Sequence, residues 1–283
     1  MTIFAEVGSV RSLSAMDLPS VEAMLESDPI THCFVASRVR GGGLDPWRLG
    51  GELLGHFTSD GLSSMLYCGA NLVPVCTDDV AREAFAQRLR LSGRRSSSIV
   101  GPRDEVLDLW QRLRHRWGRA REVRECQPLL AMSRDSELAP DPQVRVSASA
   151  DLDILVPACI AMFTAEVGVS PVVGGMGAAY RARISELVEQ GRSFVRRDGD
   201  VVVFKAEVGA ASERACQVQG VWVDPEWRGR GISAPALAAV VGLARRSIAP
   251  TVSLYVNDYN LPARRSYEAV GFRQHGELAT VLF

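Results

Sequence analysis

The segment Val221–Ser233 reads VWVDPEWRGRGIS, and it constrains the fold of the chain more than any other stretch. A short β-branched run, which predicts a strand, ends at Asp224-Pro225, where proline disfavours helix at the residue before it. Gly229 and Gly231 then precede an Ala- and Leu-rich run of helical length. Glycines at the start of a helix let backbone N–H groups approach a ligand, and first-turn amides have no acceptor within the helix. Together with the helix dipole, this pattern predicts a phosphate-binding turn.

The composition indicates a soluble globular protein that is long enough for two domains. The 283 residues are 47% apolar and 23% charged, and a net charge of -1 gives no electrostatic reason to expect nucleic acid as a partner. The six cysteines form no CxxC pair and the four histidines lack metal-ligand spacing, so we expect buried thiols and no metal. Met1–Glu6 lacks the pattern of a signal peptide, and the longest apolar run, Ala236–Ala244, is too short to span a membrane. We therefore expect a cytoplasmic protein without a membrane partner.

The two halves of the chain resemble each other. Val10-Arg11 is followed by Asp17-Leu18, and Val144-Arg145 is followed by Asp151-Leu152 at the same spacing. In both places a short strand-like start precedes an acidic residue suited to cap a helix, and then a helical pattern. An internal duplication explains this coincidence, and chance is the alternative.

A second coincidence lies further along each half, where Asp60-Gly61 and Asp198-Gly199 each separate two β-rich runs, as is typical of hairpins. The polar segment Ser133–Pro142 predicts a linker between a domain at 1–132 and a domain at 143–283. Helices that separate strands argue for a mixed α/β sheet. In the second half we expect strands at 144–147, 193–197, 201–208, 215–223, 251–256 and 278–283, and helices at 152–166, 179–190, 232–246 and 261–270.

The first half differs from the second at the glycine-rich turn. The matching place, residues 73–79, reads VPVCTDD, with two acids and no pair of glycines. Because two carboxylates would repel a pyrophosphate, we expect that the N-terminal copy is degenerate and does not bind this ligand.

Three classes of phosphate ligand compete for the turn. A P-loop needs a lysine after its last glycine, and none stands there. A dinucleotide fingerprint fits Gly229-x-Gly231-x-x-Ala234, with Asp258 beyond the next strand as a ribose-binding acid. Against it, the residues 224–228 separate the strand from the first glycine, and too few residues follow the turn to complete a dinucleotide-binding domain.

The third interpretation accounts for more residues. The run from Arg228 to Ser233 resembles the Q/R-x-x-G-x-G/A signature of the GCN5-related N-acetyltransferase (GNAT) family. Downstream, Asn260-x-x-Ala263-x-x-x-Tyr267-x-x-x-Gly271-Phe272 is similar to the second signature of that family. One departure is Ser233, where the family has glycine or alanine, but serine is small and its hydroxyl could reach a phosphate oxygen. The resemblance covers roughly residues 144–283. It implies an α/β (α+β) fold with a mixed, mostly antiparallel sheet flanked by helices, here as two tandem GNAT-like domains.

The resemblance also implies acetyl-coenzyme A as a cosubstrate, in a V-shaped gap between strands 221–223 and 251–256. Backbone groups of Val221 and Val223 would pair with the pantetheine arm. Amides of the turn would hold the pyrophosphate, with charge added by the Arg228 and Arg230 side chains. The implied cofactor-binding residues are Val221, Trp222, Val223, Arg228, Gly229, Arg230, Gly231, Ile232, Ser233 and Asn260.

By the same resemblance, Tyr267 would donate a proton to the departing coenzyme A thiolate. Its ordinary pKa, about 10, keeps the hydroxyl protonated at neutral pH. Ala263 and Gly271, four residues away on either side, leave space beside the ring on one helical face. A core tyrosine is the alternative. Asn260 would contact the cofactor, cap the helix, or do both.

The general base is less clear from the sequence. Acetylating an amine requires a neutral nucleophile, so a carboxylate or a water chain removes a proton. Gln217 and Gln219 stand on the strand where an acid would be convenient. Glu166, beside the Gly/Pro-rich loop at 168–177, is one candidate, and Glu207 on the hairpin is another. A solvated surface acid is the alternative for each.

We therefore expect a GNAT-type N-acetyltransferase that transfers acetyl directly to a primary amine of a small molecule or peptide. The N-terminal copy would complete the acceptor cleft or mediate assembly, such as a homodimer. Two other functions stay open: a transferase of the same tandem fold that uses a different acyl donor, and a non-catalytic acyl-coenzyme A sensor.

Overall fold

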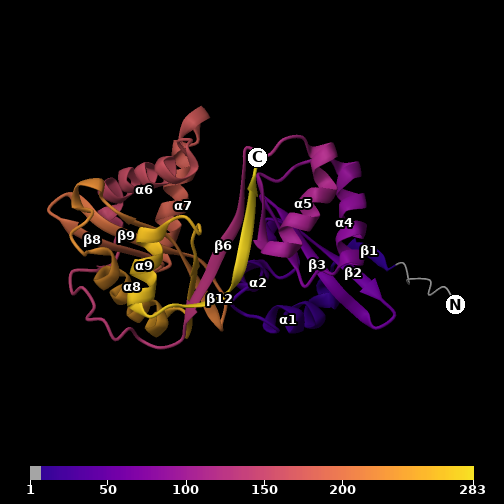
Figure 1. Ribbon diagram of the computed structural model, residues 1–283, viewed down its shortest axis with the longest axis horizontal. Coiled ribbons are helices and arrows are strands. Elements are labelled where there is room, and N and C mark those ends of the chain that lie inside the picture. The colour runs from indigo at the N-terminus through magenta and orange to yellow at the C-terminus, as the bar shows by residue number, and fades with distance from the viewer. Residues whose placement is uncertain (1–7) are drawn as a thin grey trace. The chain divides into compact units, whose positions relative to one another are not determined.

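The computed structural model describes residues 8–283, which divide into two compact units (Figure 1). Within the described residues, unit 1 comprises residues 8–129, Tyr255–Tyr259 and Gln274–Phe283, and unit 2 comprises Leu130–Leu254 and Asn260–Arg273. The expectation about a signal peptide at Met1–Glu6 lies outside the described residues. Among the helices of residues 8–283, none has the length and apolar character to cross a membrane.

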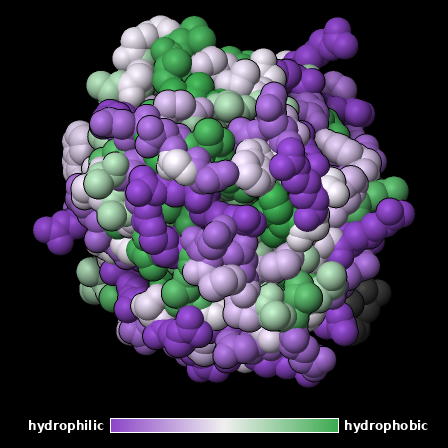
Figure 2. All heavy atoms as spheres, turned by 90° about the vertical axis from the view of Figure 1, so that its left-hand side faces the viewer, coloured by the Kyte–Doolittle hydropathy of each residue, from purple (hydrophilic) through white to green (hydrophobic). Residues whose placement is uncertain are grey.

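Unit 2 contains a mixed sheet covered by helices. Strands β7 to β10 pair antiparallel in chain order, and β11 pairs parallel with β10. Helices α6 and α7 pack on the sheet face that bears Val195, Val202 and Trp222, while α8 contacts β9 and β10 and lies beside α9 (Figure 1). The elements are β7 (Arg145–Val146), α6 (Leu152–Val167), α7 (Gly177–Glu189), β8 (Ser193–Asp198), β9 (Val201–Ala211), β10 (Ala215–Val223), α8 (Ser233–Ser247), β11 (Thr251–Tyr255) and α9 (Leu261–Val270). The surface on the β8 side mixes hydrophilic and hydrophobic side chains (Figure 2).

Unit 1 has the same kind of sheet, in the order β1-β2-β3-β4-β5-β12-β6. Alternate residues face opposite sides, so Leu54 and Leu66 pack under α4 and α5, whereas Leu53 and Met65 pack against α1 to α3. The elements are β1 (Ser9–Ser12), α1 (Leu18–Glu26), α2 (Cys33–Gly42), α3 (Pro46–Leu49), β2 (Gly51–Thr58), β3 (Gly61–Gly69), β4 (Asn71–Val75), α4 (Asp79–Ser92), β5 (Ser98–Pro102), α5 (Arg103–Trp117), β6 (Glu122–Met132) and β12 (Arg273–Leu282). Mixed, mostly antiparallel sheets flanked by helices confirm the predicted fold class.

The last strand, β12, completes the sheet of unit 1. It pairs antiparallel with β5, from Leu278↔Pro102 to Leu282↔Ser98, and its Ala279 and Val281 join the core under α4 and α5. The domain boundaries 1–132 and 143–283 stay a prediction about the sequence. The compact units differ from them at 130–132, at 255–259 and at this strand. The expected linker, 133–142, belongs to unit 2, where Asp141 pairs with Arg196 at 2.8 Å and the Ser136 hydroxyl donates to the Val270 carbonyl at 2.6 Å.

Both copies of the Val-Arg…Asp-Leu pattern form the same local structure. Arg11 donates two hydrogen bonds to the Asp17 carboxylate, at 2.7 and 2.9 Å, and Arg145 donates two to Asp151, both at 2.7 Å. In each copy the carboxylate also accepts, at 2.8 Å, from the backbone N–H three residues earlier. Identical geometry at identical spacing is what a duplication predicts.

The two hairpins form as expected, but the Asp-Gly pairs do not occupy equivalent places in them. Thr58 pairs with Gly61, so the first loop is Ser59-Asp60 and the glycine begins β3. Asp198 pairs with Val201, so the second loop is Gly199-Asp200. Asp60 therefore corresponds to Asp200 and not to Asp198, so the predicted equivalence of the two Asp-Gly pairs is wrong by two residues. Both Asp and Gly suit several positions of a tight hairpin loop, so the pair alone does not fix the register.

Candidate active site

Strands β10 and β11 are paired only where they begin. Their parallel ladder runs from Ala215↔Thr251 to Gln217↔Ser253, whereas β10 keeps its antiparallel ladder with β9 as far as Val223↔Phe204. A ladder that ends early leaves backbone groups on the β11 side of β10 for another partner. This is the arrangement required for the expected gap between residues 221–223 and β11.

A β-bulge interrupts β10 at the same place. The register with β9 shifts between the pairs Gln219↔Glu207 and Trp222↔Lys205, so Gly220 and Val221 lie inside the bulge. Gly220 has a φ of 59°, in the left-handed region that glycine adopts at low cost. A bulge re-aims backbone amides out of the ladder, which makes Val221 suitable for contacting a ligand.

The glycine turn (residues 228–233) follows β10 and leads into α8. Asp224 accepts a hydrogen bond from the Glu226 amide at 2.9 Å and starts a short 3-10 helix, Pro225–Trp227. Gly229 and Gly231 have φ values of 75° and 72°, and an added Cβ at either would point into open space. The backbone is therefore both strained for other residues and accessible to a ligand.

The amides of the glycine turn precede the hydrogen bonds of α8. The first bond from the helix back to this turn runs from the Ala236 amide to the Ile232 carbonyl at 3.1 Å, and Pro235 has no N–H to donate. First-turn amides and the helix dipole favour an anion at this position. The residues present therefore fit a pyrophosphate.

Two arginine side chains lie along the glycine turn. Arg228 Nε donates to the Val223 carbonyl at 3.1 Å, and the Arg230 guanidinium lies over the Trp227 ring at 4.8 Å from its centroid. Both arginines are exposed, so their charge stays near the turn in contact with water. The expected contact of the Val223 backbone with pantetheine stays a prediction.

Helix α9 begins beside the glycine turn. The Asn260 side chain accepts from the Ala263 amide at 3.3 Å, which shows that it caps the helix, while its contact with a cofactor stays a prediction. The Ser266 hydroxyl donates to the Ser233 hydroxyl at 2.9 Å and joins α9 to the start of α8. Sequence reasoning missed Ser266, because nothing local connects it to a residue 33 positions earlier.

The two predicted catalytic side chains, Tyr267 and Glu166, are close enough to interact. Tyr267 is 7% exposed, and its ring lies 6.3 Å from that of Phe272. Burial, with a smaller contribution from the negative charge of Glu166, raises the pKa of the Tyr267 hydroxyl to about 12. Glu166 lies exposed at the end of α6. The catalytic roles of both residues stay predictions.

Glu207, the other candidate base, is not a solvated surface acid. Its side chain is 12% exposed and lies 3.1 Å from the ammonium of Lys205, which is 1% exposed. Gln219 Nε2 donates to the other carboxylate oxygen at 3.0 Å. The sequence holds a signal for this pair, because Lys205 and Glu207 stand two apart in an apolar β-rich run and therefore face the same side.

The start of α4 occupies the matching place in unit 1. The Asp78 carboxylate caps this helix by accepting from the Ala81 amide at 2.7 Å. Glu105 accepts from both the amide and the hydroxyl of Thr77, at 2.8 and 2.6 Å. Carboxylates of the protein thus accept from the backbone here, but only Asp78 is one of the two acids that the sequence singled out, because Asp79 pairs with Arg112.

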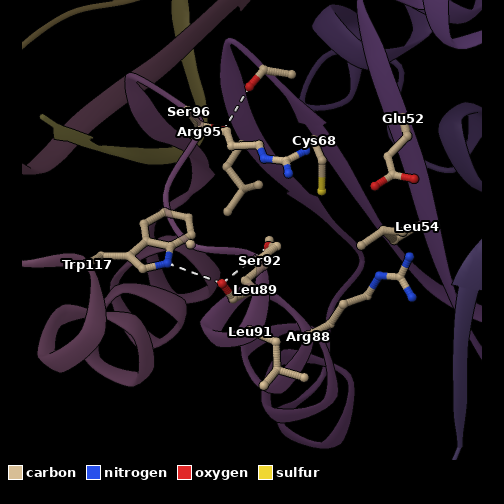
Figure 3. Close-up of a pocket in the computed structure, with 13 residues that line it drawn as sticks. Glu52, Leu54, Cys68, Arg88, Leu89, Leu91, Ser92, Arg95, Ser96 and Trp117 are labelled. Carbon is tan, nitrogen blue, oxygen red and sulfur yellow. Dashed lines mark hydrogen bonds between the residues drawn. The ribbon is translucent and has the colours of Figure 1, made fainter.

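A pocket of about 480 Å³ lies at the other end of α4. Trp117 and Glu52 line opposite sides of it, and Arg88 and Arg95 also reach it (Figure 3). Burial raises the pKa of the Cys68 thiol in its wall to about 12, so this thiol stays protonated. The pocket is remote from the Asp78 cap and is therefore not the counterpart of the glycine turn.

The expectation of buried thiols is correct for Cys33, Cys159 and Cys216 but wrong for Cys76, which is exposed. Cys76 follows β4 with a φ of 53°, in the loop that leads to α4, where the chain turns at the surface. Within residues 8–283 no cluster of His, Cys, Asp and Glu side chains could hold a metal ion.

Comparisons with known families match two successive parts of the chain. Residues 167–272 match the Acetyltransferase (GNAT) family, and residues 51–155 match a domain family of unknown function, DUF4081. A comparison with curated proteins found no match.

Solved structures match nearly the whole chain. A GCN5-related N-acetyltransferase from Sphaerobacter thermophilus is 16% identical with a TM-score of 0.60, covering 98% of this chain and 96% of that one. A GNAT-family acetyltransferase from Colwellia psychrerythraea is 12% identical, with a TM-score of 0.56 and coverages of 97% and 99%. A tandem GNAT protein from the clavulanic acid biosynthesis pathway is 11% identical, with a TM-score of 0.54 and coverages of 97% and 98%. At these identities the likeness shows the fold alone.

Proposed function

Because residues 167–272 form a GNAT acetyltransferase domain, we propose that unit 2 binds acetyl-coenzyme A and transfers its acetyl group directly to a primary amine. The observation that carries this proposal is the glycine turn. Its two left-handed glycines and its first-turn amides form an anion site at the end of a bulged, partly unpaired strand. Bound acetyl-coenzyme A supplies the acetyl group as an activated thioester.

The residues of the site bind the cosubstrate, orient the thioester and transfer protons. The amides of the glycine turn bind the pyrophosphate, and the backbone at Val221 orients the thioester. Amides of the bulge donate to the thioester oxygen, where negative charge develops. Attack by the amine nitrogen forms the C–N bond, the C–S bond breaks, and Tyr267 donates its proton to the departing sulfur.

Glu166 is the better candidate for the base that accepts the proton from the amine. It is exposed at the end of α6 and acts electrostatically on Tyr267, so it faces the same site. Glu207 is engaged by Lys205 and Gln219, and the neighbouring ammonium holds the pKa of its buried carboxylate below the ordinary value. A carboxylate with a lowered pKa is a weaker base.

The acceptor is a small molecule or a peptide that presents an amine beside Glu166. The loop that follows α6 exposes Val169, Val173 and Met176. Apolar side chains next to a carboxylate suit an amine that is carried on an apolar group. The acceptor class is therefore an amphipathic amine rather than a highly charged one.

Titration calorimetry with acetyl-coenzyme A tests the cofactor, and release of free thiol across a panel of amines tests the transfer. We expect binding in the micromolar range and thiol release that depends on an amine. Failure to bind any acyl-coenzyme A would overturn the proposal. Binding of a different acyl thioester would indicate another donor, and binding without turnover would indicate a sensor.

A further inference from the structure

The single lysine of the chain, Lys205, lies behind the bulge of β10. Its Cα partner on β10 is Trp222, the first residue paired after the bulge. The ammonium would lie 3.0 Å from a Cβ added at Gly220. The left-handed backbone at position 220 favours glycine, and the nearby ammonium leaves little room for a side chain there.

The contacts of this ammonium show how the buried Lys205–Glu207 pair is oriented relative to the bulge. Lys205 Nζ lies 3.1 Å from Glu207 Oε2, 3.4 Å from Cys159 Sγ and 3.5 Å from Met162 Sδ. Sulfur is a weak acceptor, and within residues 8–283 Glu207 is the carboxylate that pairs with this lysine. The other oxygen of Glu207 faces Gln219 and, at 4.0 Å, Arg183. Lys205 pairs with the residue after the bulge and Glu207 with the residue before it, and the ammonium is the end of the pair that lies against Gly220.

Stability does not explain such a pair. Removing two charges from water costs several kcal/mol per ion, and apolar replacements of buried ion pairs are often neutral or stabilising. Burial alone would lower the pKa of Lys205, but the carboxylate of Glu207 raises it overall, so the lysine remains a cation. Apart from Glu207, the ammonium contacts only the weak sulfur acceptors of Cys159 and Met162 among the described residues.

We propose that Lys205 is a positioning residue of acyl transfer, whose buried ammonium fixes the bulge at Gly220 and strengthens the bulge amides as donors to the thioester oxygen. This inference rests on the proposed function, because it needs a thioester at the bulge. Lys205 does not touch the cosubstrate and acts through the backbone of Gly220 and Val221. Glu207 is the counterion that offsets the free-energy cost of burying the ammonium.

The double variant Lys205→Met/Glu207→Gln tests the proposal, since it removes both charges and leaves no unpaired ion in the core. We expect kcat to fall about tenfold, equivalent to about 1.4 kcal/mol of barrier. The Kd for acetyl-coenzyme A should change by no more than about twofold, because the glycine turn is untouched. A merely structural role would instead lower the melting temperature or weaken cofactor binding.

Two further variants keep the test decisive. Lys205→Arg retains the charge and should keep kcat within about threefold of the wild type. This variant still tests the proposal if the double variant does not fold. Arg145→Met/Asp151→Asn removes a second ion pair of unit 2 that has no contact with the bulge, and it should lower stability without changing kcat. Wild-type kcat in the folded double variant, or an equal fall in kcat for Lys205→Arg, would overturn the inference alone. A wild-type protein that binds no acyl-coenzyme A would overturn the proposed function instead.

Discussion

Helices α4 and α8 both follow a strand that pairs parallel with the next one, yet they begin in opposite ways. At α4, the carboxylates of Asp78 and Glu105 accept hydrogen bonds from backbone amides. At α8, the turn carries glycines and arginines, and its amides come before the first helical hydrogen bond. At the start of α4 in unit 1, carboxylates of the protein itself accept from the backbone amides. At the start of α8 in unit 2, the corresponding amides are accessible to a ligand.

The difference indicates how one copy of a duplicated anion-binding site can lose its ligand. An internal carboxylate satisfies first-turn amides permanently and stabilises the helix without a ligand. It also repels a phosphate that approaches the same amides. Under the proposed function, the acids that cap α4 stabilise unit 1 and disfavour coenzyme A there, whereas the start of α8 in unit 2 stays open for binding.

The largest expected effect comes from giving α8 the start of α4. Ser233→Asp places a carboxylate at the first residue of the helix, beside the expected pyrophosphate. Near a protein surface, one pair of like unit charges about 4 Å apart repels by about 4 kcal/mol. We expect acetyl-coenzyme A binding to weaken at least about 100-fold in calorimetry, with the melting temperature unchanged or raised. Ser233→Ala, the matched control, should bind within about threefold of wild type. Wild-type affinity in the aspartate variant would contradict the assignment of the turn.

The next effect concerns the helix that follows. The seventh residue of α9 is Tyr267, whereas the seventh residue of α5 is the buried Leu109. Tyr267→Phe should lower kcat about 100-fold with an unchanged Kd for acetyl-coenzyme A, because only the proton donor is lost. Since the pKa of Tyr267 is about 12, the wild type should keep its activity up to about pH 10 without titration of this hydroxyl. A loss of kcat that follows a pKa near 10 would contradict the assigned acid.

A smaller effect should be shared by the two units. Asp151→Asn removes the charge that pairs with Arg145, and we expect it to lower the free energy of unfolding by about 1–2 kcal/mol. Arg145 lowers the pKa of Asp151 to about 2. Because the folded-state pKa lies below the unfolded value, this stability is present above about pH 4 and is lost as the pH falls toward the folded pKa. Denaturation by urea between pH 5 and pH 2 measures it.

Asp17→Asn is the matched variant in unit 1 and should show the same direction and pH window, since Arg11 also lowers the pKa of Asp17. If only one of the two substitutions destabilises the protein, the equivalence of the two motifs is wrong.

The smallest effects belong to helix caps. Asp78→Ala should lower the free energy of unfolding by about 1 kcal/mol, because the α4 start loses its acceptor. Asn260→Ala should cost less, since its bond to the Ala263 amide is longer, at 3.3 Å against 2.7 Å. Thermal unfolding of both variants checks the order. If Asn260→Ala instead weakens acetyl-coenzyme A binding by more than about tenfold, Asn260 contacts the cofactor as well.

The sequence was sufficient where short-range patterns decide the structure. β10 and α9 have the predicted bounds, α6 ends one residue later than predicted, and α8 is shifted by one residue at both ends. The periodicity and the caps of these segments lie within the segments themselves, so no distant residue is needed to identify them. The glycine turn was recognisable for the same reason.

Contacts between distant residues could not be predicted. Glu105 reaches Thr77 from 28 positions away, and Ser266 reaches Ser233 from 33. The burial of Glu207 depends on α6 and α7 covering its strand, which an alternating pattern of one strand does not reveal. The partner of β12 was equally hidden, because a strand pattern indicates a buried face and not which edge it joins.

The position of β12 bears on how the protein is made. All other strands and helices of unit 1 precede unit 2 in the chain, but β12 comes after α9. As the chain leaves the ribosome, the sheet of unit 1 lacks one strand and its core lacks Ala279 and Val281 until synthesis has passed residue 281. Multidomain chains ordinarily complete the N-terminal domain first. Here the elements of unit 2 emerge in full while the edge of β5 is still unpaired, so the nascent chain must protect that edge from aggregation until its final strand arrives.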